Sequence, residues 1–139
     1  MGNTVSLLQR LRKKGNRLTP LRKAMVGELE APEGLLSANE IIVLLKKKGL
    51  TPHKTSVYRE LDFLIEQGLV RKVCLGEKED RFEPAVTPHH HHAVCQKCGD
   101  IEHVDLEADI KKMERRLTRQ QFKAENHLVE FFGLCKECQ

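Results

Sequence analysis

Residues 53–83, HKTSVYRELDFLIEQGLVRKVCLGEKEDRFE, predict a helix that runs directly into a β-hairpin. Val57, Leu61 and Leu64 recur at helical spacing and form one apolar stripe. Gly68 can adopt the left-handed conformation that ends such a helix. Two short apolar segments, 69–75 and 81–83, flank a charged turn and predict the two strands of the hairpin. A helix followed at once by a hairpin is typical of a winged helix-turn-helix.

Three further helices are predicted upstream. The first spans the apolar residues from Val5 to Leu11 and ends at Gly15. The second begins at Thr19-Pro20, an N-cap followed by proline at the first helical position, and stops before Pro32. The third begins at the capping box of Ser37 and Glu40 and ends at Gly49. We therefore expect residues 1–84 to form the winged-helix domain.

The remaining chain predicts a second, smaller domain. Pro84 and Pro88 bracket a segment that suits neither a helix interior nor a central strand, so we expect a hinge at 85–88. Within 89–139 we expect strands near Ala93, over 100–105 and over 122–132. A helix between the last two would bury Leu106, Ile110, Met113 and Leu117. A domain of about 50 residues can bury only a small core, so it should need a stabilising cross-link or a partner.

Composition excludes several classes of protein. A chain of 139 residues leaves no room for a large multidomain enzyme, and 40% hydrophobic residues argue against disorder. No apolar run approaches the length of a membrane span, and the start of the chain carries no secretion signal, so we expect a cytoplasmic protein. Neither a membrane nor a small-molecule substrate is an expected partner.

Basic residues concentrate in the first half of the chain. Residues 1–84 carry 16 Lys and Arg against 11 Asp and Glu, and residues 1–27 contain no acidic side chain. Such an imbalance attracts a polyanion, although a solvated helix face would give the same pattern. Double-stranded DNA is the partner that we expect for a basic winged helix.

The helix before the hairpin supplies the predicted DNA-reading side chains. On the side opposite its apolar stripe we expect Lys54, Thr55, Tyr58 and Arg59 to enter the major groove. Arg17 and Arg22, in the acid-free stretch, should instead hold the DNA backbone or flank the minor groove. A half-buried helix tyrosine is the alternative for Tyr58.

Four of the five cysteines form two Cys-x-x-Cys pairs, Cys95/Cys98 and Cys135/Cys138. Two such turns supply a closed tetrahedral set of thiolates, which indicates a structural zinc site. Disulfides would require an oxidising compartment, and no secretion signal indicates one. The fifth cysteine, Cys74, lies in the expected second half of the hairpin's first strand, where we expect a small buried side chain.

A run of four histidines, residues 89–92, precedes the first cysteine pair. In an extended segment His90 and His92 would point to one face and His89 and His91 to the other, so two metal sites are possible. Nitrogen ligands with one carboxylate suit iron(II), zinc, manganese or nickel without choosing among them. A polar loop with no metal is the alternative.

These features together resemble the ferric uptake regulator family, over essentially the whole chain and in order. The resemblance rests on four stretches of sequence. They are Thr19-Pro20 with Arg22, the segment 55–59 (TSVYR), the histidine run before Cys-x-x-Cys-Gly, and the segment 127–135 (HLVEFFGLC). It implies an α+β fold, with an N-terminal winged helix-turn-helix domain and a small C-terminal α/β dimerisation domain that holds a structural zinc. It also implies a dimeric repressor whose DNA binding is switched by metal.

The resemblance also implies the metal ligands. The structural zinc would take Cys95, Cys98, Cys135 and Cys138. The regulatory site would take Glu83, His90, His92 and His103, and a second, more variable site would take His89, His91 and His127. Two positions depart from the common family pattern: Leu35 stands where many members have a histidine, and Ile110 stands where the variable site usually has a glutamate.

We therefore expect a metal-responsive repressor that binds DNA as a homodimer and senses iron(II), with zinc or manganese as alternative regulatory ions. A zinc-sensing or peroxide-sensing member of the same family is a second interpretation. Two other classes remain: a zinc-stapled protein-interaction module, and a metalloenzyme with Glu83 as base. The enzyme is disfavoured because the chain has no substrate-sized domain and no helical His-Glu-x-x-His motif.

Overall fold

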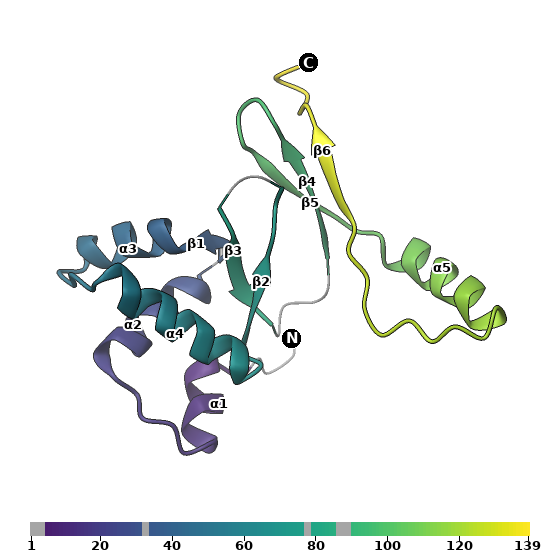
Figure 1. Cartoon of the computed structure of the whole chain (residues 1–139). Coiled ribbons are helices and arrows are strands. Elements are labelled where there is room, and N and C mark those ends of the chain that lie inside the picture. Colours follow the sequence, from purple (N-terminus) through teal and green to yellow (C-terminus); the bar gives the residue numbers. More distant parts are fainter. Residues whose placement is uncertain (1–4, 32–33, 77–78, 86–89) are drawn as a thin grey trace. The chain divides into compact units, whose positions relative to one another are not determined.

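The computed structural model describes residues 5–31, 34–76, 79–85 and 90–139. Two compact units divide the chain, Met1–Thr87 and Pro88–Gln139. Each unit combines helices with a small sheet, and the α+β class is confirmed (Figure 1). The unit boundary falls within the expected hinge, of which residues 86–88 lie outside the described residues, as does His89.

Capping residues set the helix boundaries of the N-terminal unit. Thr19 and Ser37 cap α2 (Pro20–Leu29) and α3 (Ala38–Lys47) as predicted, and α4 (Lys54–Glu66) is followed by Gly68 with φ of 71°. The first helix, α1 (Leu7–Lys13), starts later than predicted. Ser6 and Gln9 form a capping box there, so the helix begins at Leu7 and leaves Val5 outside it.

A short strand that the sequence pattern did not predict completes the hairpin sheet. The strand β1 (Leu36–Ser37) pairs with β3 (Arg81–Pro84), which also pairs with β2 (Val70–Val73). Two residues are too few to show strand periodicity, and the same serine caps α3. Cys74 follows β2 and is exposed, so its expected burial was wrong.

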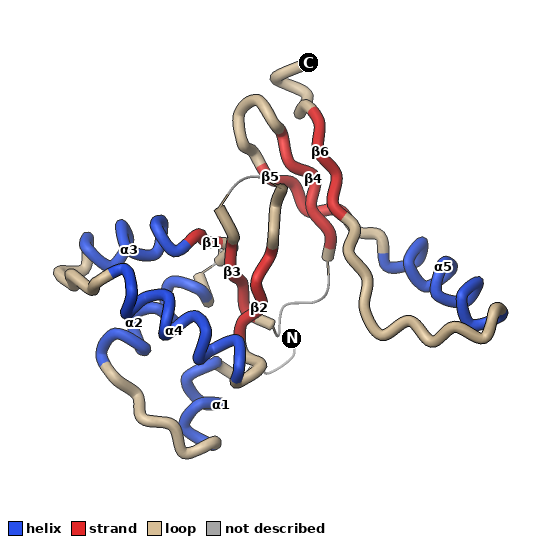
Figure 2. Tube along the Cα trace, in the orientation of Figure 1, coloured by secondary structure: helices blue, strands red, loops and turns tan. Residues whose placement is uncertain are grey.

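The apolar stripes of the four helices converge on one core. Its fully buried members include Leu11, Met25, Ile41 and Leu61, one from each helix. Phe82 on β3 closes the core from the sheet side. Because one side of α4 packs into this core, its opposite side faces outward. Figure 2 shows that α4 is followed by the hairpin strands β2 and β3.

The C-terminal unit is built on a three-stranded sheet in the order β5-β4-β6. The central strand β4 (His91–Cys95) runs antiparallel to β5 (Ile101–Val104) and parallel to β6 (Glu130–Gly133). The expected strand over 122–132 is therefore mostly wrong, because pairing with β4 begins at Glu130. The segment before it is an irregular chain that returns from α5 (Glu107–Arg119).

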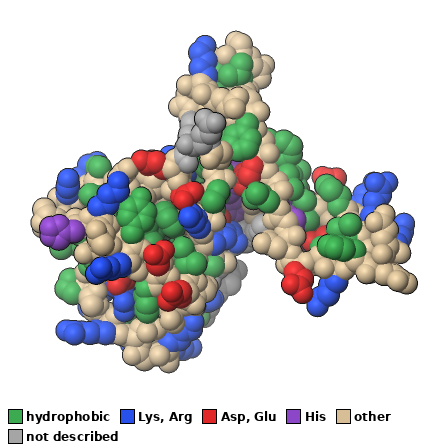
Figure 3. All heavy atoms as spheres, viewed as in Figure 1, with side chains coloured by type: hydrophobic (Ala, Val, Ile, Leu, Met, Phe, Trp, Pro, Cys, Tyr) green, Lys and Arg blue, Asp and Glu red, His purple; other side chains and the backbone are tan. Residues whose placement is uncertain are grey.

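The helix α5 projects away from the three strands (Figure 1). Its expected apolar face is covered only in part: Ile110 is buried, whereas Met113 is 52% exposed. Further large apolar side chains of this unit are also exposed: Phe122, Leu128, Phe131, Phe132 and Leu134. Figure 3, in which hydrophobic side chains are green, shows several of them on the surface of the part of the molecule that contains α5.

Among the described residues, no helix combines the length and the apolar character that crossing a membrane requires.

Candidate metal centres and nucleic-acid face

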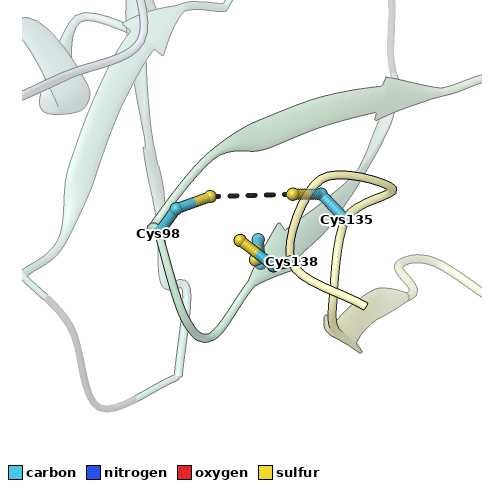
Figure 4. Close-up of side chains that lie close together, drawn as sticks. Cys98, Cys135 and Cys138 are labelled. Atoms are coloured by element: carbon cyan, nitrogen blue, oxygen red, sulfur yellow. Dashed lines mark hydrogen bonds between the residues drawn. The ribbon is translucent and has the colours of Figure 1, made fainter.

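The parallel pairing of β4 with β6 brings the two cysteine pairs together. Cys95 ends β4 opposite Gly133 of β6, so the turns that follow these strands lie at the same end of the sheet. Gly99, with φ of 81°, closes the first turn by donating its N–H to the Cys95 carbonyl at 2.8 Å. Figure 4 shows the sulfur atoms of Cys98, Cys135 and Cys138 pointing toward one another from the two turns.

The four thiols have the spacing of a tetrahedral metal site. Their sulfur atoms all lie within 4.8 Å of one another, and the Sγ atoms of Cys98 and Cys135 are 3.8 Å apart. Zn–S bonds of about 2.3 Å in a tetrahedron require sulfur atoms about 3.8 Å apart. All five cysteines are free of disulfide bonds. The residues present therefore fit a closed structural zinc site.

Local hydrogen bonds shift the pKa values of two of these thiols in opposite directions. Backbone N–H groups of Cys98 and Cys135 donate toward Cys95 and lower the pKa of its thiol to about 5. The side-chain hydrogen bond with Cys135, together with burial, raises the pKa of Cys138 to about 12. Binding of a metal by thiols of raised pKa releases protons.

A second group lies at the opposite end of β4. His90, His92 and His103 each place a ring nitrogen within 4.8 Å of the others. The His90 ring centroid lies 4.8 Å from that of His92 and 4.6 Å from that of His103. His92 and His103 face each other across the β4–β5 pair, and His90 shares their face through strand alternation. The three imidazoles converge closely enough to hold one ion.

Glu83, the carboxylate predicted for this site, belongs to the N-terminal unit. It lies on β3, where its Oε1 accepts a hydrogen bond from Nε of Arg71 at 2.7 Å. Its ligation of the regulatory metal stays a prediction.

A carboxylate that sequence reasoning missed lies beside the histidine group. Glu130 is the register partner of His92 across the β4–β6 pair, and its Oε2 lies 3.5 Å from Nδ1 of His92. No spacing motif marks this residue, because it lies 38 positions from His92 in the sequence. The parallel register places the two side chains side by side.

The other face of β4 carries His91, whose ring lies 5.2 Å from that of His127. Nδ1 of His91 lies 3.1 Å from the Val129 carbonyl, which can only accept a hydrogen bond. Glu114 of α5, a residue the sequence analysis did not select, places Oε1 3.6 Å from Nδ1 of His127. Glu114 lies one helical turn after the buried Ile110 on the same helix.

The side of α4 that faces away from the core presents the predicted DNA-reading residues. Lys54, Thr55 and Arg59 are exposed, and Tyr58 is 41% exposed. Nζ of Lys54 lies 5.9 Å from the centroid of the Tyr58 ring. Figure 3 shows other Lys and Arg side chains on the surface of the N-terminal unit. Arg17 is exposed as well.

Arg22 differs from the other predicted DNA contacts because its guanidinium is occupied within the fold. Its Nε and NH2 groups donate to the Glu60 carboxylate at 2.9 and 2.8 Å, and its guanidinium carbon lies 3.9 Å from the centroid of the Phe63 ring. A third donor group reaches the Arg17 carbonyl. These contacts join α2 to α4, so the structure favours a structural role for Arg22.

The ferric uptake regulator family model matches residues 13–132 of the chain. This protein belongs to the ferric uptake regulator (Fur) family. The ferric uptake regulation protein of Bacillus subtilis is 32% identical, over 99% of this chain and 96% of the relative. The peroxide operon regulator of the same organism is 31% identical, over 94% of this chain and 90% of the relative.

The solved structure of the Helicobacter pylori ferric uptake regulator superposes with a TM-score of 0.82 at 28% identity, covering 96% of this chain and 89% of that one. Fur-family proteins are metal-responsive transcription regulators and not enzymes, so the metalloenzyme interpretation was wrong. The family resemblance inferred from the sequence is confirmed.

Proposed function

We propose that this Fur-family protein is a homodimeric repressor that binds operator DNA when iron(II) occupies a site formed by Glu83, His90, His92 and His103. The observation behind this proposal is the group of three histidines whose ring nitrogens lie within 4.8 Å of one another. Imidazole and carboxylate ligands suit iron(II), and the Bacillus subtilis relative is named for ferric uptake. Control of metal-uptake genes would follow from iron sensing.

Zinc in the four-cysteine site would stabilise the C-terminal unit. A domain of about 50 residues buries too little apolar surface to fold securely, and a closed thiolate site contributes folding energy directly. The spacing of Cys98 and Cys135 supports this assignment.

The proposed operator contacts come from Lys54, Thr55, Tyr58 and Arg59 on α4, with Arg17 on the DNA backbone. Two-fold symmetry of the dimer would place one such helix in each half-site. The exposed apolar side chains of the C-terminal unit support dimerisation there, because a monomer rarely leaves so many large apolar groups in water.

A second metal site, formed by His91, His127 and His89, is also proposed, with Glu114 as its carboxylate. The contact of Glu114 with His127 supports this assignment. The Helicobacter pylori regulator is described as having three functional metal-binding sites.

Zinc sensing is the second candidate function. Three imidazoles from one unit form a nitrogen-rich set, which zinc accepts as readily as iron, and zinc binds such a set more tightly at equal availability.

Selection of duplexes from a random DNA pool, under anaerobic conditions, tests the proposal. The protein with zinc in its cysteine site is incubated with Fe²⁺, Mn²⁺, Zn²⁺ or no added metal. We expect a palindromic sequence to be enriched with Fe²⁺ and not without metal. Enrichment by Zn²⁺ alone would favour the second candidate, and equal enrichment without metal would contradict metal sensing. Metal analysis of protein purified from its native host then identifies the ion in the cell.

A further inference from the structure

A single row of side chains crosses the C-terminal sheet at the proposed sensor. His92 on the central strand pairs in register with His103 on β5 and with Glu130 on β6. Residues directly opposite each other on neighbouring strands project from the same face of a sheet. Glu130 and His103 therefore flank His92 on the face that also carries His90.

Glu130 lies partly buried beside this group, with a side chain only 11% exposed and its Oε2 atom buried. Its Oε2 has no hydrogen bond of normal geometry among the described residues, and Nδ1 of His92 is 3.5 Å away. A buried carboxylate oxygen is costly without a donor, so the contact favours an N–H on Nδ1 of His92.

Among the described residues, the ligand atoms that converge within 4.8 Å at this site belong to His90, His92 and His103, and Glu130 is not one of this group. Its carboxylate therefore acts on the metal site through His92. Neutral imidazole carries one proton, so a proton held on Nδ1 leaves the lone pair of Nε2 for a metal. A carboxylate behind a metal-binding histidine fixes the ring orientation and makes the ligand nitrogen more basic.

We propose that Glu130 is a positioning residue of the sensor, which holds His92 with its proton on Nδ1 and Nε2 directed to the regulatory metal. The inference rests on the proposed function of the histidine group. It places a carboxylate beside a set of three imidazoles within the C-terminal unit. Metal affinity would then be set partly by β6, a strand that contributes no ligand.

The test compares full-length variants that retain zinc in the cysteine site. Co²⁺ is titrated into the sensor and followed by its visible absorption. We expect Glu130→Ala to bind Co²⁺ about 10- to 100-fold more weakly. Glu130→Gln keeps an oxygen that accepts from Nδ1 and should lose less. Glu102→Ala is the matched control, because Glu102 is an exposed carboxylate on β5, adjacent to His103 and therefore on the opposite face.

A second measurement shows directly which ring nitrogen of His92 carries the proton. Long-range ¹H–¹⁵N spectra of the histidine rings, recorded before Co²⁺ is added, should place the proton of His92 on Nδ1 in the wild type. In Glu130→Ala the population should shift toward the Nε2 tautomer. A merely structural role for Glu130 would leave the tautomer unchanged.

Unchanged Co²⁺ affinity in a folded Glu130→Ala protein, or a wild-type proton on Nε2, overturns the proposal. The wild-type spectrum decides the question even where the alanine variant does not fold. The His92→Ala variant distinguishes failure of the Glu130 inference from failure of the proposed sensor function on which it rests. If that variant still binds Co²⁺ with the wild-type spectrum, the sensor assignment itself is wrong. If it loses Co²⁺ while Glu130→Ala does not, only the role of Glu130 is wrong.

Discussion

Arg22 shows how a charged residue in a basic stretch acquires a structural role. The sequence places it among cations with no acidic neighbour before residue 28. Folding brings it against Glu60 and Phe63 of α4, and its side chain becomes only 12% exposed. A charged hydrogen bond with two parallel N–H donors is strong and directional, and it holds α2 against α4.

Replacing Arg22 with alanine should therefore lower the free energy of unfolding of the N-terminal unit by about 2 to 4 kcal/mol, because Glu60 would keep a largely buried charge without its partner. Urea denaturation of the full-length protein measures the effect. Lys23→Ala is the control: it removes an exposed cation from the same helix and should change stability by less than about 0.5 kcal/mol. Unchanged stability with lost DNA binding would instead assign Arg22 to the DNA.

At the scale of elements, one side of α4 packs into the core and the other side forms the proposed DNA-binding surface. Val57, Leu61 and Leu64 are fully buried, and Tyr58 lies on the exposed side. Tyr58→Ala should weaken binding to operator DNA by about 1 to 3 kcal/mol and change binding to random DNA little, since a base contact discriminates sequence. Fluorescence anisotropy with metal-loaded protein gives both affinities.

Arg17→Ala tests a different kind of contact from the same unit. A phosphate contact carries no sequence information, so this variant should weaken operator and random DNA alike. The slope of log affinity against log salt concentration should fall by about one. If Arg17→Ala alters sequence preference, or Tyr58→Ala does not, the assignment of the two contact types is wrong.

The two cysteine turns are proposed to depend on a bound zinc ion for their stability. Cys98→Ser removes one of four thiolates and should unfold or monomerise the C-terminal unit. Structural zinc contributes roughly 10 to 16 kcal/mol in small zinc peptides, as much as the stability of a whole domain. Zinc content, sedimentation and thermal unfolding report the loss. Cys74→Ser is the control, since this exposed thiol lies outside the group. A zinc-free wild-type protein with an intact dimer would refute the assignment.

At the scale of the molecule, the proposed switch couples a histidine group in one unit with a carboxylate in the other. A metal can favour the DNA-binding arrangement only if it binds that arrangement more tightly, typically by about 1 to 3 kcal/mol. Glu83→Ala and His90→Ala should abolish the metal-stimulated part of DNA binding and leave the cysteine-bound zinc in place. Titration of Fe²⁺ into a DNA-binding assay measures this.

The histidines predicted for the opposite face provide the controls. His91→Ala and His89→Ala should reduce metal-stimulated DNA binding less than His90→Ala does. Equal loss from both pairs would contradict a sensor on one face of β4. No loss from either pair would support the alternative of a polar histidine loop.

Local chemistry made much of this protein predictable from its sequence. Helix caps at Thr19 and Ser37, the glycine after α4 and the two Cys-x-x-Cys turns each depend on residues a few positions apart. Their physical determinants are short-range hydrogen bonds and permitted backbone angles, so the sequence displays them directly. The four helices of the first unit and the two separate cysteine turns followed from such signals.

Tertiary structure decided the features that depend on residues distant in sequence. The two-residue strand β1 exists only because β3 offers it a partner, and the strand before Glu130 is absent because its pairing with β4 starts there. Glu130 reaches His92, and Glu60 reaches Arg22, only through strand register and helix packing. These pairings join residues that are far apart in the chain, and for this reason no local pattern of the sequence encodes them.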